Sequence, residues 1–338
     1  MATKTLSENI NQAVSDFNSI KQAIVNKGVD VPTGTPTSQY GAKISEIQTG
    51  GGELPTKGFV PTKWDTNGYI TEGDFYGDTV SDNYFHSGSS NPHNPFYDKL
   101  VNVNMENVTN VGNYAFYCCT RLTNSELPQN LTKIGDSGFS NCTYVKFSEF
   151  PSTLTSIGSS AFNHCGNVLF SELPNCLATD IPKYIFAYCN DVTFSQLPNT
   201  LVSIGANAFQ NCTKVTFSQL PNTLTSIGAT AFFGCLIVTF SELPKNLTKI
   251  EDSTFSSCSK VTFSRIPATV KSIARNAFYN CKGITSMTFE SKPTTINSTA
   301  FSGCTNLTTM NVPWSQGQVA GIPFGASSAT INYDYTEE

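Results

Sequence analysis

Apolar residues recur along the chain in blocks of one length. A phenylalanine stands three residues before a cysteine in nine places, and successive pairs are 23 residues apart, except for one step of 24. The cysteines are Cys119, Cys142, Cys165, Cys189, Cys212, Cys235, Cys258, Cys281 and Cys304. A valine or isoleucine lies five residues before each phenylalanine. Because a fixed period of this size marks a solenoid, the pattern predicts nine stacked units over residues 106–312.

One unit illustrates the strand that the pattern predicts. Val215, Phe217 and Leu220 alternate with polar residues, which is typical of a half-buried strand. Pro221 ends this run because proline has no backbone donor for a ladder.

The rest of the unit predicts a helical turn and a second extended piece. Residues 208–212 place apolar side chains at helical spacing, and the second piece runs through Leu224 and Ile227 to Gly228. A unit of 23 residues cannot bury its own apolar face, so stacking must supply the core. The expected fold class is an α/β solenoid with a short N-terminal helix and non-repeat caps.

Two columns of the repeat fill this core. A second phenylalanine column favours packing over an aromatic binding strip, although the strip remains an alternative. The cysteines stand one to a rung and point the same way, which favours buried free thiols over disulfides or a metal site. The second phenylalanine column is Phe147, Phe170, Phe194, Phe217, Phe240 and Phe263.

Polar residues between the apolar columns are the best candidates for a binding surface. They should project from the stacked strands as a hydroxyl-rich face with few charges. The candidates are Thr193, Ser195, Gln196, Thr216, Ser218, Gln219, Thr239, Ser241 and Glu242. Four glutamates share the position of Gln196 and Gln219, and we expect them to form a solvated stripe rather than an acid–base pair. They are Glu126, Glu149, Glu172 and Glu242.

Units of the form Ile-Gly-x-x-Ala-Phe-x-x-Cys-x-x-Leu resemble the BspA-like leucine-rich repeat family. The unit at residues 304–313 is similar to the common form of that family, whereas the middle units carry Val-Thr-Phe-Ser-Glu/Gln-Leu instead of its usual strand. The resemblance covers residues 106–313. It implies a repeat solenoid that works in adhesion and recognition rather than catalysis.

The N-terminal segment, residues 1–48, has a different pattern. Apolar residues repeat at alternating steps of four and three, as in a coiled-coil seam, which predicts a helix that anchors the chain or brings copies together. A single helix packed on its own chain remains an alternative. The seam residues are Leu6, Ile10, Ala13, Phe17, Ile20 and Ile24. Three glycines within residues 49–57 predict a flexible hinge.

Residues 58–105 interrupt the repeat and are rich in aromatic residues. We expect an N-terminal cap over the open end of the solenoid. Alternatively, Trp64, Tyr69 and Tyr76 belong to a glycan- or receptor-binding module. His86 and His93 are too loosely spaced to predict a metal site.

Both ends of the chain also resemble phage proteins. The seam and the glycine-rich stretch together, including residues 27–32, are similar to the N-terminal segment of tail-associated proteins from phages of gut Firmicutes. Residues 313–338 are similar to the closing segment of phage and bacterial family members. We expect those last residues to cap the solenoid. The resemblance implies a virion tail protein with other tail proteins as neighbours.

Composition narrows the function. Charged residues make up 13% of the chain and the net charge is −5, without the basic cluster that a nucleic-acid partner requires. No apolar run reaches the ~20 residues of a membrane span, and the first 30 residues lack the layout of a signal peptide.

We therefore expect a non-catalytic phage recognition protein, of the tail-fibre or receptor-binding type, without cofactor or metal. Its partners would be a host cell-surface glycan or protein, other tail proteins and further copies of itself, for example in a trimer. Alternatives are a bacterial surface or secreted adhesin and, as a minor one, a glycan depolymerase.

Overall fold

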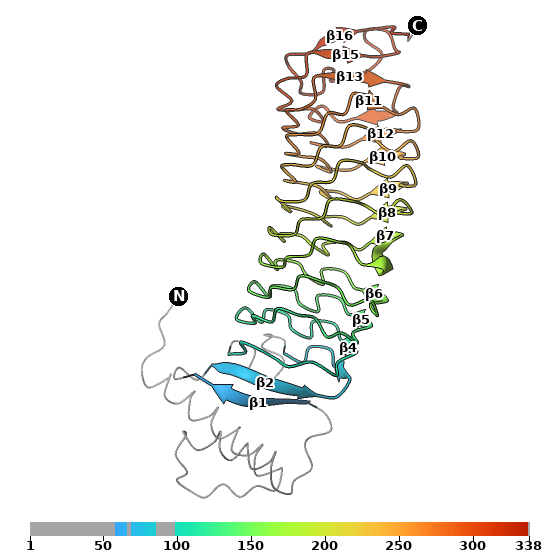
Figure 1. Ribbon diagram of the computed structural model, residues 1–338. Coiled ribbons are helices and arrows are strands. Elements are labelled where there is room, and N and C mark those ends of the chain that lie inside the picture. Colours follow the sequence, from blue (N-terminus) through green and yellow to red (C-terminus); the bar gives the residue numbers. More distant parts are fainter. Residues whose placement is uncertain (1–57, 66–68, 86–98, 337–338) are drawn as a thin grey trace, which may run out of the picture.

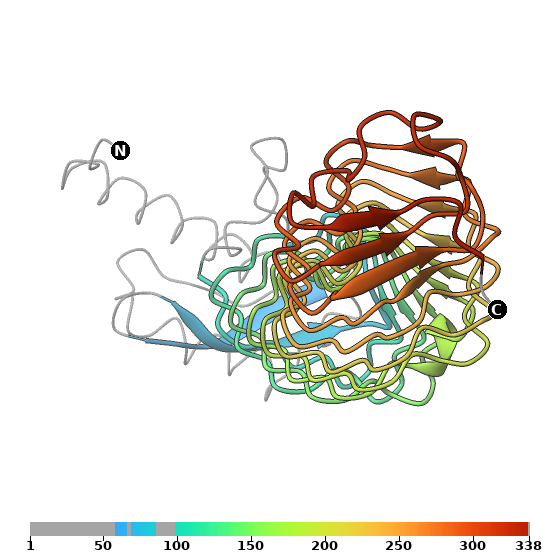
Figure 2. The ribbon, with the colours of Figure 1, turned by 90° about the horizontal axis from the view of Figure 1, so that it is seen from above.

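The computed structural model describes residues 58–65, 69–85 and 99–336, which form a curved stack of similar turns of chain (Figure 1). Seen along the stack, successive turns overlie one another with a gradual offset (Figure 2). We call each turn a rung and name it after its cysteine. The helix expected within residues 1–48 and the hinge at 49–57 lie outside the described residues.

A ladder of two-residue parallel strands runs up one side of the stack. In each strand an apolar residue points inward and a polar residue points outward, which explains the Val/Ile column of the sequence. These strands are β3 (Thr79–Val80), β4 (Asn110–Val111), β5 (Lys133–Ile134), β6 (Ser156–Ile157), β7 (Asp180–Ile181), β8 (Ser203–Ile204), β9 (Ser226–Ile227), β10 (Lys249–Ile250), β12 (Ser272–Ile273) and β14 (Thr295–Ile296). They pair in the orders β3-β4-β5-β6, β7-β8-β9 and β10-β12-β14.

The 24-residue unit coincides with a break in this ladder. Its extra residue lies between Leu177, where the 3₁₀ helix η2 (Asn175–Leu177) ends, and Ile181 of β7, and β6 and β7 do not pair. Cys176, which the repeat does not explain, lies in η2 and is half-buried. Since η2 is the only helix among the described residues, the α/β part of the expected fold class is not confirmed.

The core consists of the columns that the sequence predicts. From Phe116 to Phe301, the phenylalanine rings stack face to face with centroids 5.0–6.0 Å apart. The second column meets the first edge to face, as Phe217 meets Phe209 at 5.2 Å. All nine ladder cysteines are buried free thiols, as predicted. The thiol of Cys212 donates a hydrogen bond to the carbonyl of Phe186 on the preceding rung at 3.0 Å, and the other ladder thiols do likewise.

The prediction of a helical turn at residues 208–212 is wrong. The segment between the short strand and the ladder cysteine, which we call the turn side, is a chain of tight turns. Asn207 and Asn211 have positive φ values of 59° and 56°, which a right-handed helix does not allow. Amide N–H groups alternate between a carbonyl three residues back, as from Cys212 to Phe209, and a carbonyl on the next rung, as from Asn211 to Phe233.

The turn side places two residues per rung in the left-handed region over most of the stack. The position just before the ladder cysteine holds Cys118, Asn141, His164, Tyr188, Asn211, Gly234, Ser257, Asn280 and Gly303. Cys118 therefore occupies a backbone position that usually holds Asn or Gly, rather than the buried position of Cys119.

The strand expected at residues 215–220 is present only in part. Its side chains alternate as predicted, with Val215, Phe217 and Leu220 buried. In the middle of the stack, however, a single backbone hydrogen bond joins this segment to the same segment of the preceding rung, as from the amide of Thr216 to the carbonyl of Phe194 at 2.9 Å. Regular strands form here only near the C-terminal end. They are β11 (Arg265–Ile266), β13 (Ser286–Phe289), β15 (Thr309–Asn311) and β16 (Thr330–Asn332), paired in that order.

Residues 58–105 contain a further rung as well as a hairpin. β3 pairs with β4, and Phe85 stacks on Phe116 at 4.9 Å. The Val/Ile column and the first phenylalanine column therefore both start one rung before the first ladder cysteine. The antiparallel hairpin of β1 (Gly58–Trp64) and β2 (Ile70–Tyr76) packs Phe59 against Phe85. At the other end, β16 pairs with β15, next to the buried Trp314.

Candidate functional site

The outward residues between the ladder cysteine and the following proline form what we call the strand face. Its polar side chains are exposed because they alternate with the buried columns. All nine predicted candidates from Thr193 to Glu242 are exposed. Backbone bonds of 2.9 Å from Thr193 to Phe170 and from Thr239 to Phe217 hold the threonines in line.

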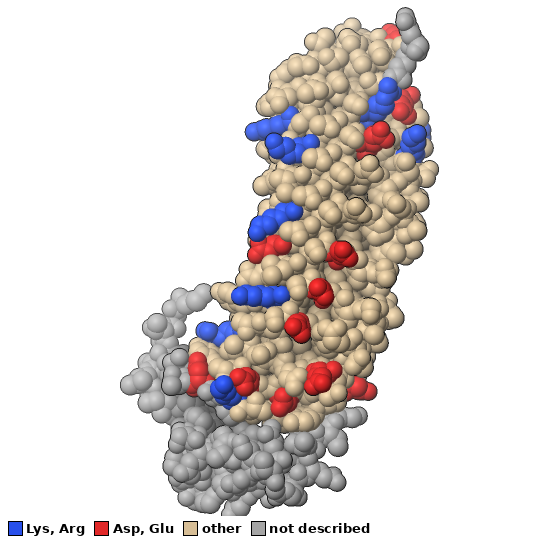
Figure 3. Space-filling model, viewed as in Figure 1, with Lys and Arg blue, Asp and Glu red and all other residues tan. Residues whose placement is uncertain are grey.

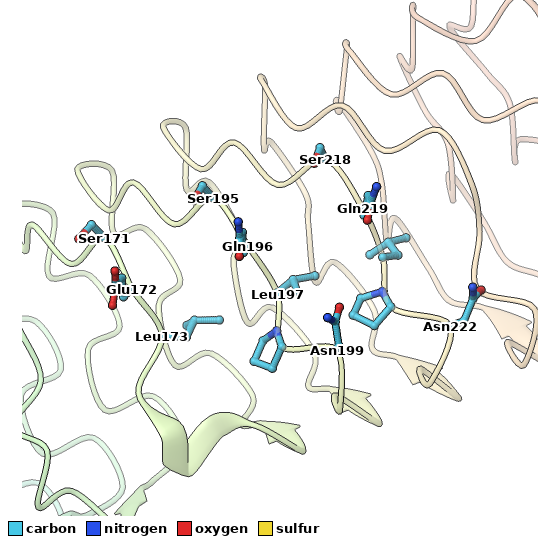
Figure 4. Close-up of a pocket in the computed structure, with 13 residues that line it drawn as sticks. Ser171, Glu172, Leu173, Ser195, Gln196, Leu197, Asn199, Ser218, Gln219 and Asn222 are labelled. Atoms are coloured by element: carbon cyan, nitrogen blue, oxygen red, sulfur yellow. The ribbon is translucent and has the colours of Figure 1, made fainter.

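A groove runs along one edge of the strand face. It has a volume of about 970 Å³ and crosses three rungs, with Ser, Gln or Glu on one wall and Leu, Pro and Asn on the other (Figure 4). The lining residues are Ser171, Glu172, Leu173, Ser195, Gln196, Leu197, Pro198, Asn199, Ser218, Gln219, Leu220, Pro221 and Asn222. The groove thus brings together Ser195, Gln196, Ser218 and Gln219 of the predicted set.

The second wall of this groove was missed by the sequence analysis. Pro221 was treated only as the end of a strand, although Pro198 and Pro221 each turn the chain so that the following asparagine borders the groove. The recurring Leu-Pro-Asn motif was the available signal. Proline fixes its own φ, which explains why the wall has the same shape on successive rungs.

The groove continues toward the N-terminal rungs in two smaller parts of about 420 and 250 Å³. On these rungs the repeat position of Gln196 and Gln219 holds Glu126, Glu149 and Glu172. Figure 3 shows acidic side chains in a line between the levels of β5 and β7. All three carboxylates are exposed and, within the described ranges, none is in an ion pair.

The aromatic candidates of the N-terminal segment lie apart from this groove. Tyr69 is half-buried, and the Arg121 guanidinium lies 4.2 Å from the centre of its ring. Tyr76 is half-buried at the end of β2. Trp64 lies in β1, and its side chain is outside the described part. His86 and His93 are also outside it.

The buried thiols are unsuited to nucleophilic or metal chemistry. Burial raises the pKa of Cys212, Cys235 and Cys258 well above the ordinary value, and that of Cys304 to about 12. A thiol that stays protonated is neither a nucleophile nor a metal ligand. In the part of the chain that the structure describes, no three His, Cys, Asp or Glu side chains are grouped to hold a metal ion, and no helix is long and apolar enough to cross a membrane.

The ladder of short strands, the stacked core columns and the 23-residue rung define a leucine-rich repeat solenoid. The family model described as "BspA type Leucine rich repeat region (6 copies)" matches residues 92–193 and 179–308. The chain therefore belongs to the BspA-type leucine-rich repeat family.

Several solved structures are similar to the chain. A leucine rich cell surface protein from Faecalibacterium prausnitzii A2-165 is 19% identical, with 84% of this chain and 94% of that one covered and a TM-score of 0.49. A leucine-rich repeat protein from Bacteroides ovatus ATCC 8483 is 16% identical, with 83% and 98% covered and a TM-score of 0.33. One from Eubacterium ventriosum ATCC 27560 is 15% identical, with 79% and 92% covered and a TM-score of 0.38. None of the curated proteins compared with the chain matches it.

Proposed function

We propose that this protein is a non-catalytic recognition protein whose strand face binds a glycan or protein on a host cell surface. The observation that carries the proposal is the groove between its two repeated walls, Ser with Gln or Glu on one side and Leu, Pro and Asn on the other, because they offer similar polar groups at each rung. A ligand with a repeating structure can make the same contact several times on such a surface. Repeated weak contacts then add up to firm attachment.

We further propose that the chain is part of a phage tail. The coiled-coil pattern from Leu6 to Ile24, the glycine-rich stretch at 49–57 and the resemblance of the N-terminal segment to phage tail-associated proteins support this location. In this arrangement residues 1–48 attach to other tail proteins or to further copies of the chain, for example in a trimer. The solenoid then projects toward the host.

Electron microscopy of virions labelled with gold-conjugated antibody to the full chain tests the location. We expect gold particles on the tail. Unlabelled virions, together with the chain in the medium or wall fraction of the producing cells, would instead assign it to a bacterial surface or secreted adhesin.

Binding of the purified full chain to intact host cells tests the strand face. Replacing Gln196 and Gln219 by Arg should weaken binding by about tenfold or more. Arginine is chosen because Arg265 occupies the same repeat position on another rung. The control is Ser226→Ala, since Ser226 is exposed in β9, outside the groove. Equal binding by both variants would contradict the assignment of the groove.

The non-catalytic part of the proposal has its own test. Incubation with purified host capsule or wall glycan should leave the size distribution of the glycan unchanged. Shortening of the glycan would instead identify a depolymerase.

A further inference from the structure

Two exposed side chains with large apolar surfaces, Leu169 and Tyr144, lie on the N-terminal half of the strand face. The column of Leu169 holds threonine on seven rungs and Lys146 on another, yet Leu169 is 48% exposed. Tyr144, on the preceding rung, is 54% exposed. Exposed leucine and tyrosine side chains add little to the stability of the fold.

The backbone gives no reason for a leucine at position 169. The amide of Leu169 donates to Phe147 at 2.7 Å, as the amide of Thr193 donates to Phe170 at 2.9 Å. Val168 and Phe170 on either side of Leu169 are fully buried, so the leucine side chain points outward like the threonines of its column. A threonine would therefore serve the fold equally well at position 169.

Carboxylates border the same area. Glu149 and Glu172 lie on the rungs of Tyr144 and Leu169, and Glu126 lies on the rung before. They line the two smaller parts of the groove together with Phe150, whose ring stacks on Phe170 at 3.8 Å. The corresponding positions of the next two rungs hold the neutral Gln196 and Gln219, and the rung after them holds Glu242. Three successive carboxylates therefore occur in this column only on the half with the exposed Tyr144 and Leu169.

We propose that this area docks a polypeptide segment that carries an apolar side chain next to lysine or arginine. Leu169 and Tyr144 would cover the apolar side chain, and the line of Glu126, Glu149 and Glu172 would face the basic residues. Charge complementarity favours this occupant over a neutral glycan, which leaves three carboxylates without counter-charges. The inference rests on the proposed role of the strand face as a recognition surface.

Selection of a displayed library of random twelve-residue peptides on the immobilised full chain tests this proposal. We expect enrichment of peptides with an apolar residue beside Lys or Arg. The double variant Tyr144→Asn, Leu169→Thr uses the residues that other rungs carry at these positions, so it should fold normally. It should bind the enriched peptides about tenfold or more weakly.

Two further variants test separately whether the carboxylates contribute to binding and whether the effect is specific to this area. Glu126→Gln, Glu149→Gln and Glu172→Gln combined should weaken binding and remove its dependence on salt. Ile237→Lys is the matched control, because Ile237 is 41% exposed in the column of Tyr144 but lies on the Cys235 rung, whose only carboxylate in the glutamate column is Glu242 and which is three rungs beyond that of Glu172. Its binding should be unchanged.

Enrichment of peptides without basic residues, no enrichment, or equal binding by the double variant would overturn the proposal. Light scattering of the full chain adds one outcome: an oligomer that the double variant abolishes would assign the area to a second copy of the chain. Unlabelled virions would refute the phage location without affecting the peptide result, so the two failures are distinguishable.

Discussion

The two sides of each rung are built under different constraints. On the turn side, left-handed backbone positions, buried thiols and stacked rings restrict almost every residue, and amide groups bond to the next rung at every second position. On the strand face, one backbone bond per rung holds a line of exposed side chains in the middle of the stack. A rung can therefore change its outward residues with little effect on the fold. This difference explains how one scaffold carries Gln219 in one rung, Glu172 in another and Arg265 in a third.

The largest effect that separates the two sides is expected in the phenylalanine column. Phe209→Ala removes a fully buried ring that stacks on Phe186 and Phe232, and should lower the free energy of unfolding by about 3–5 kcal/mol. Chemical denaturation followed by circular dichroism measures this. Phe233→Ala is the control, since Phe233 is half-buried outside the core and its loss should cost less than about 1 kcal/mol. Equal losses would contradict the core assignment.

A smaller effect is expected where rungs approach closely. A methyl group on Gly228 would collide with the backbone of Ala206 on the preceding rung. Gly228→Ala should therefore destabilise the protein by about 1–3 kcal/mol, as overpacking generally does. The same position holds Ala274 on a later rung, so Ala274→Gly serves as the control and should change stability by less than about 1 kcal/mol. A neutral Gly228→Ala variant would show that the rungs separate freely.

The left-handed positions predict a gain in stability. Thr230 has a φ of 55°, an unfavourable conformation for a β-branched residue, where the preceding rung has Asn207. Thr230→Asn should raise the free energy of unfolding by about 1 kcal/mol, because asparagine tolerates this conformation. Thermal unfolding measures the gain. A loss of stability would mean that the bond from Thr230 Oγ1 to the carbonyl of Ala229 outweighs the strain.

The smallest effect is expected on the strand face. Thr216→Lys introduces a lysine, which Lys146 shows at the same repeat position of another rung. It should change the free energy of unfolding by no more than about 0.5 kcal/mol. Denaturation beside the unmodified chain checks this. A loss comparable with that of Gly228→Ala would contradict the contrast between the two sides.

The repeat in the sequence predicted the solenoid, the buried thiols and the exposed residues, because each depends on spacing alone. The prediction of a helical turn at 208–212 was wrong. Tight turns with alternating left-handed residues bring Ala208, Phe209 and Cys212 inward, and these positions have the same spacing as the inward face of a helix. The column from Cys118 to Gly303, rich in Asn and Gly, contained the signal that would have corrected it.

The groove was only half predicted, because its second wall depends on the path of the chain after each proline. The additional rung at Phe85 was missed for a related reason. Val80 and Phe85 keep the five-residue spacing of the repeat, but no cysteine stands three residues after Phe85 and the next phenylalanine of the column, Phe116, comes 31 residues later. The pairing of β3 with β4 and the stacking of Phe85 on Phe116 identify the rung.

Thiol labelling tests the stacked core most directly. The native full chain is treated with iodoacetamide at pH 8 and mapped by mass spectrometry, then labelled again in guanidinium chloride. Burial keeps the ladder thiols inaccessible, whereas Cys118 and Cys176 are only half-buried. We predict that only Cys118 and Cys176 react in the native chain, Cys176 the more slowly because burial raises its pKa to about 11, and that all nine ladder cysteines react after unfolding. Native labelling of Cys212 or Cys235, or disulfides between ladder cysteines, would contradict the account.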